Sequence, residues 1–136
     1  MSLKIGRIVM GICQTNCYFI YEEGKKEVIF VDPADRGDLI YNKLTEAGFT
    51  VAGILLTHAH FDHIWGAEKL RELTGAKIYA NEEEKVLCED AKKNISHASG
   101  RPCTIAPDVY LKDGDVITIA GMTAQMIATP GHTCGS

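Results

Sequence analysis

The chain has 136 residues, which is room for one domain and little more. Apolar residues make up 46% of it and charged residues 24%, an ordinary globular composition that argues against a disordered chain. The 14 basic and 18 acidic residues give a net charge of −4, and without a basic run this balance argues against nucleic-acid binding.

The apolar stretches argue against a membrane protein. The longest one near the middle, Val51 to Leu56, has six residues, far fewer than the roughly 18 that cross a bilayer. No basic segment followed by an apolar run opens the chain, so we expect no secretory signal. An odd number of unevenly spaced cysteines then favours reduced thiols and a cytoplasmic location. These cysteines are Cys13, Cys17, Cys88, Cys103 and Cys134.

The first predicted elements are strands. Lys4 to Cys13 and Cys17 to Tyr21 are expected to form two strands that are joined by the polar turn Gln14-Thr15-Asn16. A second turn leads into a short buried strand, Val28 to Val31, which stops at Asp32-Pro33.

Helices and strands alternate in the next part of the chain. Asp38 to Ala47 carries its apolar residues on one helical face, and Gly48 is well placed to end that helix. Val51 to Thr57 is apolar along its length, as expected of a strand covered on both faces. Asp62 to about Thr74 predicts a second helix, and Ala76 to Ala80 another short strand.

Asn81 and Glu84 resemble a capping box, in which each side chain bonds to the backbone N–H of the other residue. The helix that they open is expected to run from Glu82 to Lys93, acidic to basic, as the helix dipole favours. Glu82 to Glu84 are interpreted as a helix start and not as a metal site.

From Val109 onward, apolar residues recur at every second position, as is typical of strands. Asp113-Gly114 is a hairpin signal that leads to predicted strands at Val116 to Ala120 and Thr123 to Thr129. Together the elements predict a single strand-rich α/β (α+β) domain over residues 1–136.

The segment that indicates a chemistry is Thr57-His58-Ala59-His60-Phe61-Asp62-His63, where a buried strand turns into a helix. His58 and His60 can aim at one point, and Asp62 and His63 can face a second point nearby. Imidazole and carboxylate are ligands of zinc, iron or manganese, and three of them with an open position make a catalytic site. Chance alone gives H-x-H-x-D-H about 0.0004 times in such a chain. We therefore predict a metal site rather than histidines that only cap or solvate a helix.

A fourth histidine stands in Thr129-Pro130-Gly131-His132-Thr133, after an apolar strand. The Pro-Gly turn fixes the direction in which its imidazole points. Taken alone, a histidine after a turn is weak evidence. Paired with the first cluster, His132 is the expected third ligand from a distant part of the chain.

These two motifs resemble those of the metallo-β-lactamase superfamily and, more narrowly, those of the glyoxalase II-like hydrolases. The resemblance implies an αββα sandwich with the metal site at one edge. It also implies which residues bind: His58, His60 and His132 would hold one metal, and Asp62 and His63 would belong to a second. Two zinc ions are expected in the complete domain, with iron or manganese as alternatives.

Asp32 matches the strand-end aspartate of the family, which orients metal ligands without binding the metal. The alternative is that Asp32 merely turns the chain before Pro33.

The implied activity is hydrolysis of small esters, with thioesters as the expected substrates. A metal-bound hydroxide would attack the carbonyl group, and Asp62 would serve both as a ligand and as a catalytic base. Two alternatives remain. The related persulfide dioxygenases share the motif but use one iron, so the identity of the metal separates the two activities. The chain can also be an incomplete metal-binding domain without turnover.

The sequence departs from the family pattern at its end. Only four residues follow His132, so a bridging carboxylate, a last histidine and the substrate-binding helices are missing. We expect the chain to supply the N-terminal part of the sandwich. The alternative is that a partner chain, such as a second copy in a homodimer, completes it.

Overall fold

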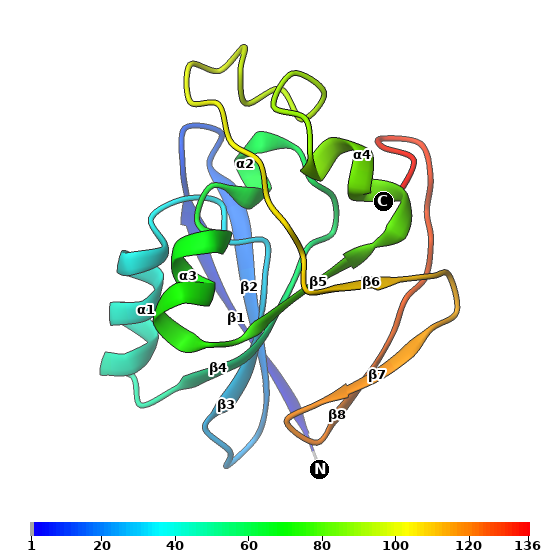
Figure 1. Cartoon of the computed structure of the whole chain (residues 1–136). Coiled ribbons are helices and arrows are strands. Elements are labelled where there is room, and N and C mark those ends of the chain that lie inside the picture. Colours follow the sequence, from blue (N-terminus) through cyan, green and yellow to red (C-terminus); the bar gives the residue numbers. More distant parts are fainter. Residues whose placement is uncertain (1) are drawn as a thin grey trace.

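Six strands form the main sheet of the computed structural model, which describes residues 2–136 (Figure 1). Their order across the sheet is also their order along the chain. The first three strands are antiparallel, and the third to the sixth are parallel. The six are β1 (Leu3–Met10), β2 (Thr15–Glu22), β3 (Glu27–Val31), β4 (Thr50–Leu55), β5 (Lys77–Asn81) and β6 (Val109–Leu111).

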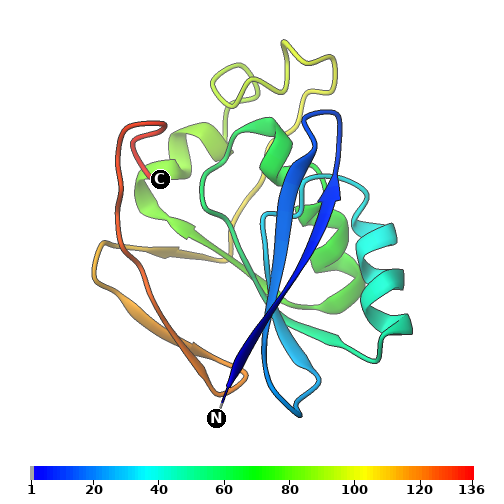
Figure 2. The same ribbon diagram turned by 180° about the vertical axis from the view of Figure 1, so that it is seen from behind.

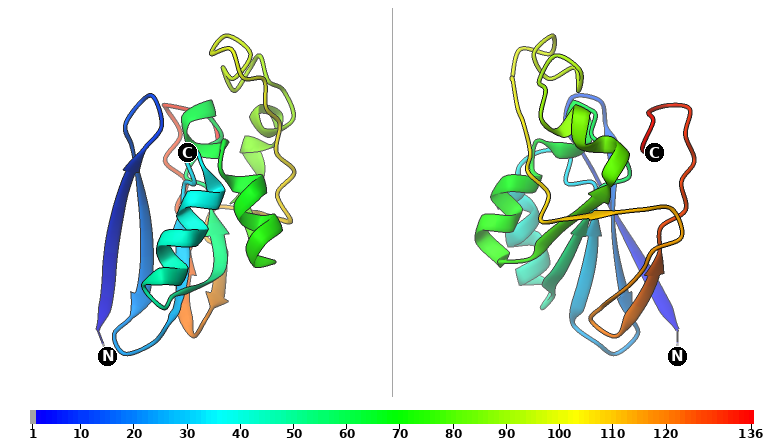
Figure 3. Two further views of the ribbon diagram at one scale, coloured as in Figure 1. Left: turned by 90° about the vertical axis from the view of Figure 1, so that its left-hand side faces the viewer. Right: turned by 45° about the vertical axis from the view of Figure 1, so that its right-hand side comes forward.

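Helices cover one face of this sheet, because parallel neighbours need crossover connections. α1 (Gly37–Glu46) connects β3 to β4, while α2 (Phe61–Ile64) and α3 (Ala67–Thr74) connect β4 to β5. α1 and α3 pack side by side, on the opposite side of the sheet from the C-terminal hairpin (Figure 3). The main core lies beneath them and includes Val28, Phe30, Ile40, Leu44, Ile54, Leu70 and Ile78.

The last two strands, β7 (Val116–Ile119) and β8 (Met122–Gln125), form a separate two-stranded sheet. Ala120 and Gly121 make its turn with φ angles of 53° and 78°. Two consecutive residues with positive φ are typical of a type I′ turn, which matches the twist of a hairpin. Ile119 and Met122 at the turn pack against Ile29 of the main sheet.

The predicted hairpin turn at Asp113-Gly114 is therefore wrong in its position. The N–H of Asp115 donates to the carbonyl of Lys112 at 3.0 Å, so this turn carries the chain from β6 to β7, which lie in different sheets. The predicted strand from Thr123 to Thr129 is also too long, because β8 ends at Gln125.

The predicted helix from Asp62 to Thr74 is broken at Gly66. The N–H of Gly66 donates to the carbonyl of Pro33 at 2.8 Å, and a Cβ atom at this position would lie 2.8 Å from the carbonyl oxygen of Asp35. This close approach of another loop divides α2 from α3. It also places the Asp32-Pro33 turn against the helix that starts with the histidine motif.

The predicted long helix after Asn81 is wrong as well. A 3₁₀ turn at Glu82–Glu84 is followed by α4 (Lys85–Cys88), and no helix or strand occurs from there to β6. Asn81 does cap the turn, since its side chain accepts from the N–H of Glu83 at 3.0 Å. The side chain of Glu84 bonds elsewhere, so the capping box is only half formed.

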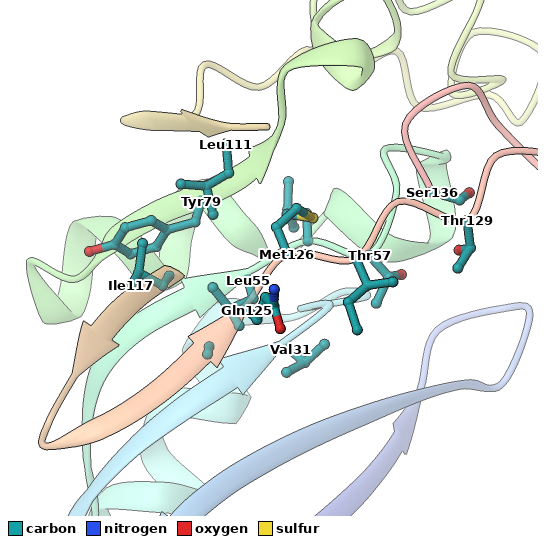
Figure 4. Close-up of a pocket in the computed structure, with 13 residues that line it drawn as sticks. Val31, Leu55, Thr57, Tyr79, Leu111, Ile117, Gln125, Met126, Thr129 and Ser136 are labelled. Carbon is teal, nitrogen blue, oxygen red and sulfur yellow. The ribbon is translucent and has the colours of Figure 1, made fainter. Parts of the chain in front are cut away.

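The face of the main sheet opposite the helices is only partly covered. β1 lies at one edge of the sheet (Figure 2), and Ile5 on this strand is 69% exposed. Between the main sheet and the hairpin, an apolar cavity of about 310 Å³ is lined by Leu55, Tyr79, Ile117 and Met126 among others (Figure 4).

Within residues 2–136, no helix is long and apolar enough to cross a membrane.

We expect the substitution Gly66→Ala to lower the free energy of unfolding by about 1–3 kcal/mol, the usual cost of forcing extra atoms into a packed site. The added Cβ would push against the carbonyl of Asp35. Urea denaturation measures the effect, with Glu46→Ala at an exposed position of α1 as the control. Equal stability of the two variants would contradict this account of the helix break.

Candidate metal centre

The ends of three parallel strands bring the site residues to one edge of the main sheet. Asp32 follows β3, the segment from Thr57 to His63 follows β4, and Glu84 comes shortly after β5. Carboxyl ends of parallel strands meet at the same edge, which is where open α/β sheets bind their ligands. His132 reaches this edge from the segment after β8.

Three of the predicted ligands form one group. His58, His60 and His132 each offer a ring nitrogen, and these nitrogens lie within 4.8 Å of one another. Nδ1 of His60 and Nε2 of His132 are 3.0 Å apart. Two nitrogens that bind one tetrahedral zinc are separated by about 3.3 Å, so the spacing suits a shared metal.

The hydrogen bonds of His58 leave one of its nitrogens free for a metal. The hydroxyl of Thr57 donates to Oδ2 of Asp32 at 2.6 Å, so its oxygen can accept from Nδ1–H of His58 at 3.1 Å. The other nitrogen, Nε2, then carries a lone pair. It is buried and has no hydrogen-bond partner among residues 2–136. A metal ion would supply the partner that this buried nitrogen lacks.

Two of these histidines, His58 and His60, also have the protonation state that metal binding requires. Burial lowers the pKa of His58 to about 4, and the nearby charge of His63 acts in the same direction. Burial likewise lowers the pKa of His60, with repulsion from His132 as the second cause. Both imidazoles are therefore neutral at pH 7, which is the form that binds metal.

Asp62 and His63 lie beside this group without joining it. The ring centroids of His63 and His58 are 4.0 Å apart with the rings tilted by 49°, and Nε2 of His63 is 3.4 Å from Oδ2 of Asp62. The hydroxyl of Thr15, on β2, donates to the same oxygen at 2.8 Å. These side chains line an open depression of about 360 Å³ below the β1–β2 turn.

Asp32 bonds both to Thr57, next to the three-histidine group, and to His63. Oδ1 accepts from the N–H of Thr57 at 2.7 Å, and Oδ2 lies 2.9 Å from Nδ1 of His63. Burial lowers the pKa of His63, but the bond to Asp32 and the charge of that carboxylate outweigh it, so the pKa is raised overall. The backbone of Asp32 has a φ of 55°, a costly conformation for a residue other than glycine.

Three residues of this site were not predicted from the sequence. Thr57 belongs to the histidine motif, where its place before His58 was the available signal, but Thr15 and Glu84 had no local signal. Glu84 is fully buried and bonds to the loops of His58 and His132, although it was expected only to start a helix.

The metal-free chain is expected to lose stability as the pH falls from 7 to 5. Unfolded His58 takes up a proton near pH 6.5 and folded His58 only near pH 4, so protons favour the unfolded state between these values. Only below about pH 4, where folded and unfolded His58 are both protonated, would the loss reach its full value of about 3 kcal/mol. The raised pKa of His63 offsets part of it, because that residue adds stability below pH 6.5.

Urea unfolding at several pH values checks this expectation, with His58→Gln as the comparison. The variant should lose less stability between pH 7 and pH 5 than the wild-type chain does. A wild-type stability that stays constant or rises on acidification would contradict it.

Some of the sequence relatives carry hydrolase names. A Bacillus subtilis protein named probable metallo-hydrolase YqgX is 35% identical over 136 residues, which cover 98% of this chain and 64% of that protein. A hydroxyacylglutathione hydrolase of Pseudomonas putida (strain F1) is 33% identical over 118 residues, or 87% of this chain and 39% of that enzyme.

Solved structures share the fold. The BLEG-1 B3 metallo-β-lactamase matches with a TM-score of 0.89 and 34% identity, over 98% of this chain and 65% of that one. TTHA1623 in a di-iron-bound form matches with a TM-score of 0.77 and 25% identity, over 96% and 63%. This chain thus spans less than two thirds of the length of these four proteins.

The predicted fold class is confirmed by these structural matches, and the family model described as the metallo-beta-lactamase superfamily matches residues 10–136. Since this match covers nearly the whole chain and includes all of the site residues, the chain belongs to the metallo-β-lactamase superfamily.

Proposed function

We propose that this chain carries the principal metal site of a hydrolase that cleaves small esters, with thioesters as the preferred substrates. The observation that carries the proposal is the unpartnered Nε2 of His58, buried within a group of three histidines. Relatives that are named metallo-hydrolase and hydroxyacylglutathione hydrolase support the hydrolase class and suggest a thioester substrate.

The donor set fits a transition metal. We assign one ion to His58, His60 and His132, and assign Asp62 and His63 to a second ion whose remaining ligands are not found among residues 2–136. Zinc is the expected metal, and the di-iron form of TTHA1623 supports iron as the alternative. A metal bound here would activate water as a nucleophile and polarise the carbonyl group of the substrate.

The residues of the chain would orient these reactants and move the proton. The hydroxyl of Thr15 and Nε2 of His63 both lie against Oδ2 of Asp62. This arrangement leaves Oδ1 of Asp62 as the oxygen that accepts a proton. Asp32 fixes His63 through Nδ1, so that its Nε2 faces Asp62 and the depression.

The test is release of free thiol from a hydroxyacyl-glutathione thioester by the zinc-loaded chain, compared with the chain after chelation. We expect zinc-dependent cleavage that is faster than that of an oxygen ester with the same acyl group. Equal rates with and without zinc, or cleavage of neither ester by the zinc-loaded chain, would contradict the proposal.

A further inference from the structure

Glu84 is a buried carboxylate that the proposed reaction does not use. Its side chain is 0% exposed, although it follows the exposed residues Glu82 and Glu83. Burying a carboxylate away from water costs free energy unless hydrogen bonds within the protein replace those to water. The partners of Glu84 therefore indicate what the residue is for.

All of those partners belong to the two loops that carry the histidines. Oε1 accepts from the N–H of Ala59 at 2.8 Å and from the hydroxyl of Thr133 at 2.9 Å. Oε2 accepts from the N–H of Gly135 at 3.1 Å. Ala59 stands between His58 and His60, and Thr133 follows His132. One carboxylate thus joins both loops.

The C-terminal loop has few other attachments. Among the hydrogen bonds within residues 2–136, those that connect residues 129–136 to the rest of the chain end on Glu84 and on His60. The contact is also close, since a Cβ atom at Gly135 would lie 2.7 Å from Cγ of Glu84. The position of His132 relative to His58 and His60 therefore depends on this carboxylate.

We propose that Glu84 is a positioning residue that sets the third ligand, His132, at the distance from His58 and His60 that one metal ion requires. This inference rests on the proposed metal site. Residues that hold metal ligands in place without touching the metal typically change its affinity 10–100-fold when they are replaced.

The substitution Glu84→Gln keeps one acceptor oxygen and replaces the other with an NH₂ donor. Its amide oxygen can still accept from Ala59 and Thr133, but its NH₂ group would face the N–H of Gly135, and two donors cannot bond. The variant should therefore lose the bond to Gly135 and loosen the His132 loop, which keeps only the bond from Thr133, while the His58–His60 loop stays in place. Glu83→Gln, at the exposed neighbouring position, is the matched control.

The experiment is titration of the metal-free chain with Co²⁺, whose visible absorption reports on its ligands, in four proteins: wild type, Glu84→Gln, His132→Ala and the double variant. We expect Glu84→Gln to weaken Co²⁺ binding about 10-fold or more in the wild-type background. In the His132→Ala background, it should change binding less than about 2-fold, because the ligand through which it acts is gone. Glu83→Gln should bind as the wild type does.

A second variant approaches the same contact from the other side. Gly135→Ala places a methyl group against Glu84 and should weaken Co²⁺ binding in the same background-dependent way, which keeps the proposal testable if Glu84→Gln does not fold. An equal loss in both backgrounds, or no loss in either, would overturn the role of Glu84 while the metal site stands. Failure of the wild-type chain to bind Co²⁺ would overturn the metal site and this inference together.

Discussion

Replacing His58 with alanine is expected to weaken metal binding more than about 100-fold and to abolish metal-dependent hydrolysis. A residue that only supports a ligand costs up to about 100-fold when it is removed, so a ligand itself should cost more. His58 is the most buried of the three clustered histidines. Its Nε2 has no hydrogen-bond partner among residues 2–136, and we assign the metal as its partner. Equilibrium dialysis against buffered zinc measures the affinity.

The control for this prediction is His97→Ala. His97 lies exposed in the segment between α4 and β6 and is not part of the histidine group, so its replacement should leave zinc affinity unchanged. Equal affinity of His58→Ala and His97→Ala would show that His58 is a packed histidine and not a ligand.

Replacing Asp62 with asparagine is expected to reduce the rate of hydrolysis by about 10² to 10⁴-fold, the usual contribution of a general base. The amide keeps the shape of the carboxylate and can still accept from Thr15, but it cannot take up a proton. The ion at the three histidines should remain bound, because Asp62 is not part of that group. Rates and metal content measured on the same sample separate the two effects.

Asp38→Asn is the matched control, because the ion pair of Asp38 with Arg36 is exposed and of the kind that contributes little. It should leave both the rate and the metal content unchanged. Full activity of Asp62→Asn with full metal content would remove Asp62 from the mechanism as a base.

The histidine loop could be predicted because its signal is local. His58, His60, Asp62 and His63 stand within six residues, so their proximity in space follows from the chain itself. The strand before them is largely apolar, and its end determines where the loop lies. His132 could be predicted only by pairing a weak turn signal with this strong cluster.

The contacts that hold the site together could not be predicted, because they depend on pairs far apart in the sequence. Thr15 bonds to Asp62 across 47 positions, and Glu84 bonds to Gly135 across 51. A run of three glutamates is typical of an exposed helix start. Nothing in the run indicates that the third one turns inward.

The errors in the predicted elements have the same origin. Gly66 lies in a helical pattern of apolar residues, and the helix breaks there because the carbonyl of Pro33 takes its N–H. After Cys88, the buried side chain of Asn94 donates to the carbonyls of Leu87 and Cys103 and holds the chain in an irregular path. Local propensity cannot anticipate such partners.

The most direct test of this account is the metal content of the chain, measured by elemental analysis after purification without a chelator and again after incubation with zinc. The account predicts one firmly bound ion per chain, retained on dialysis by the wild type and lost by His132→Ala. A single iron ion in place of zinc would favour the mononuclear-iron dioxygenase alternative, whereas a pair of iron ions would match the di-iron form of TTHA1623. A wild-type chain that holds no metal even after incubation with zinc would contradict the central claim that the three histidines form a metal site.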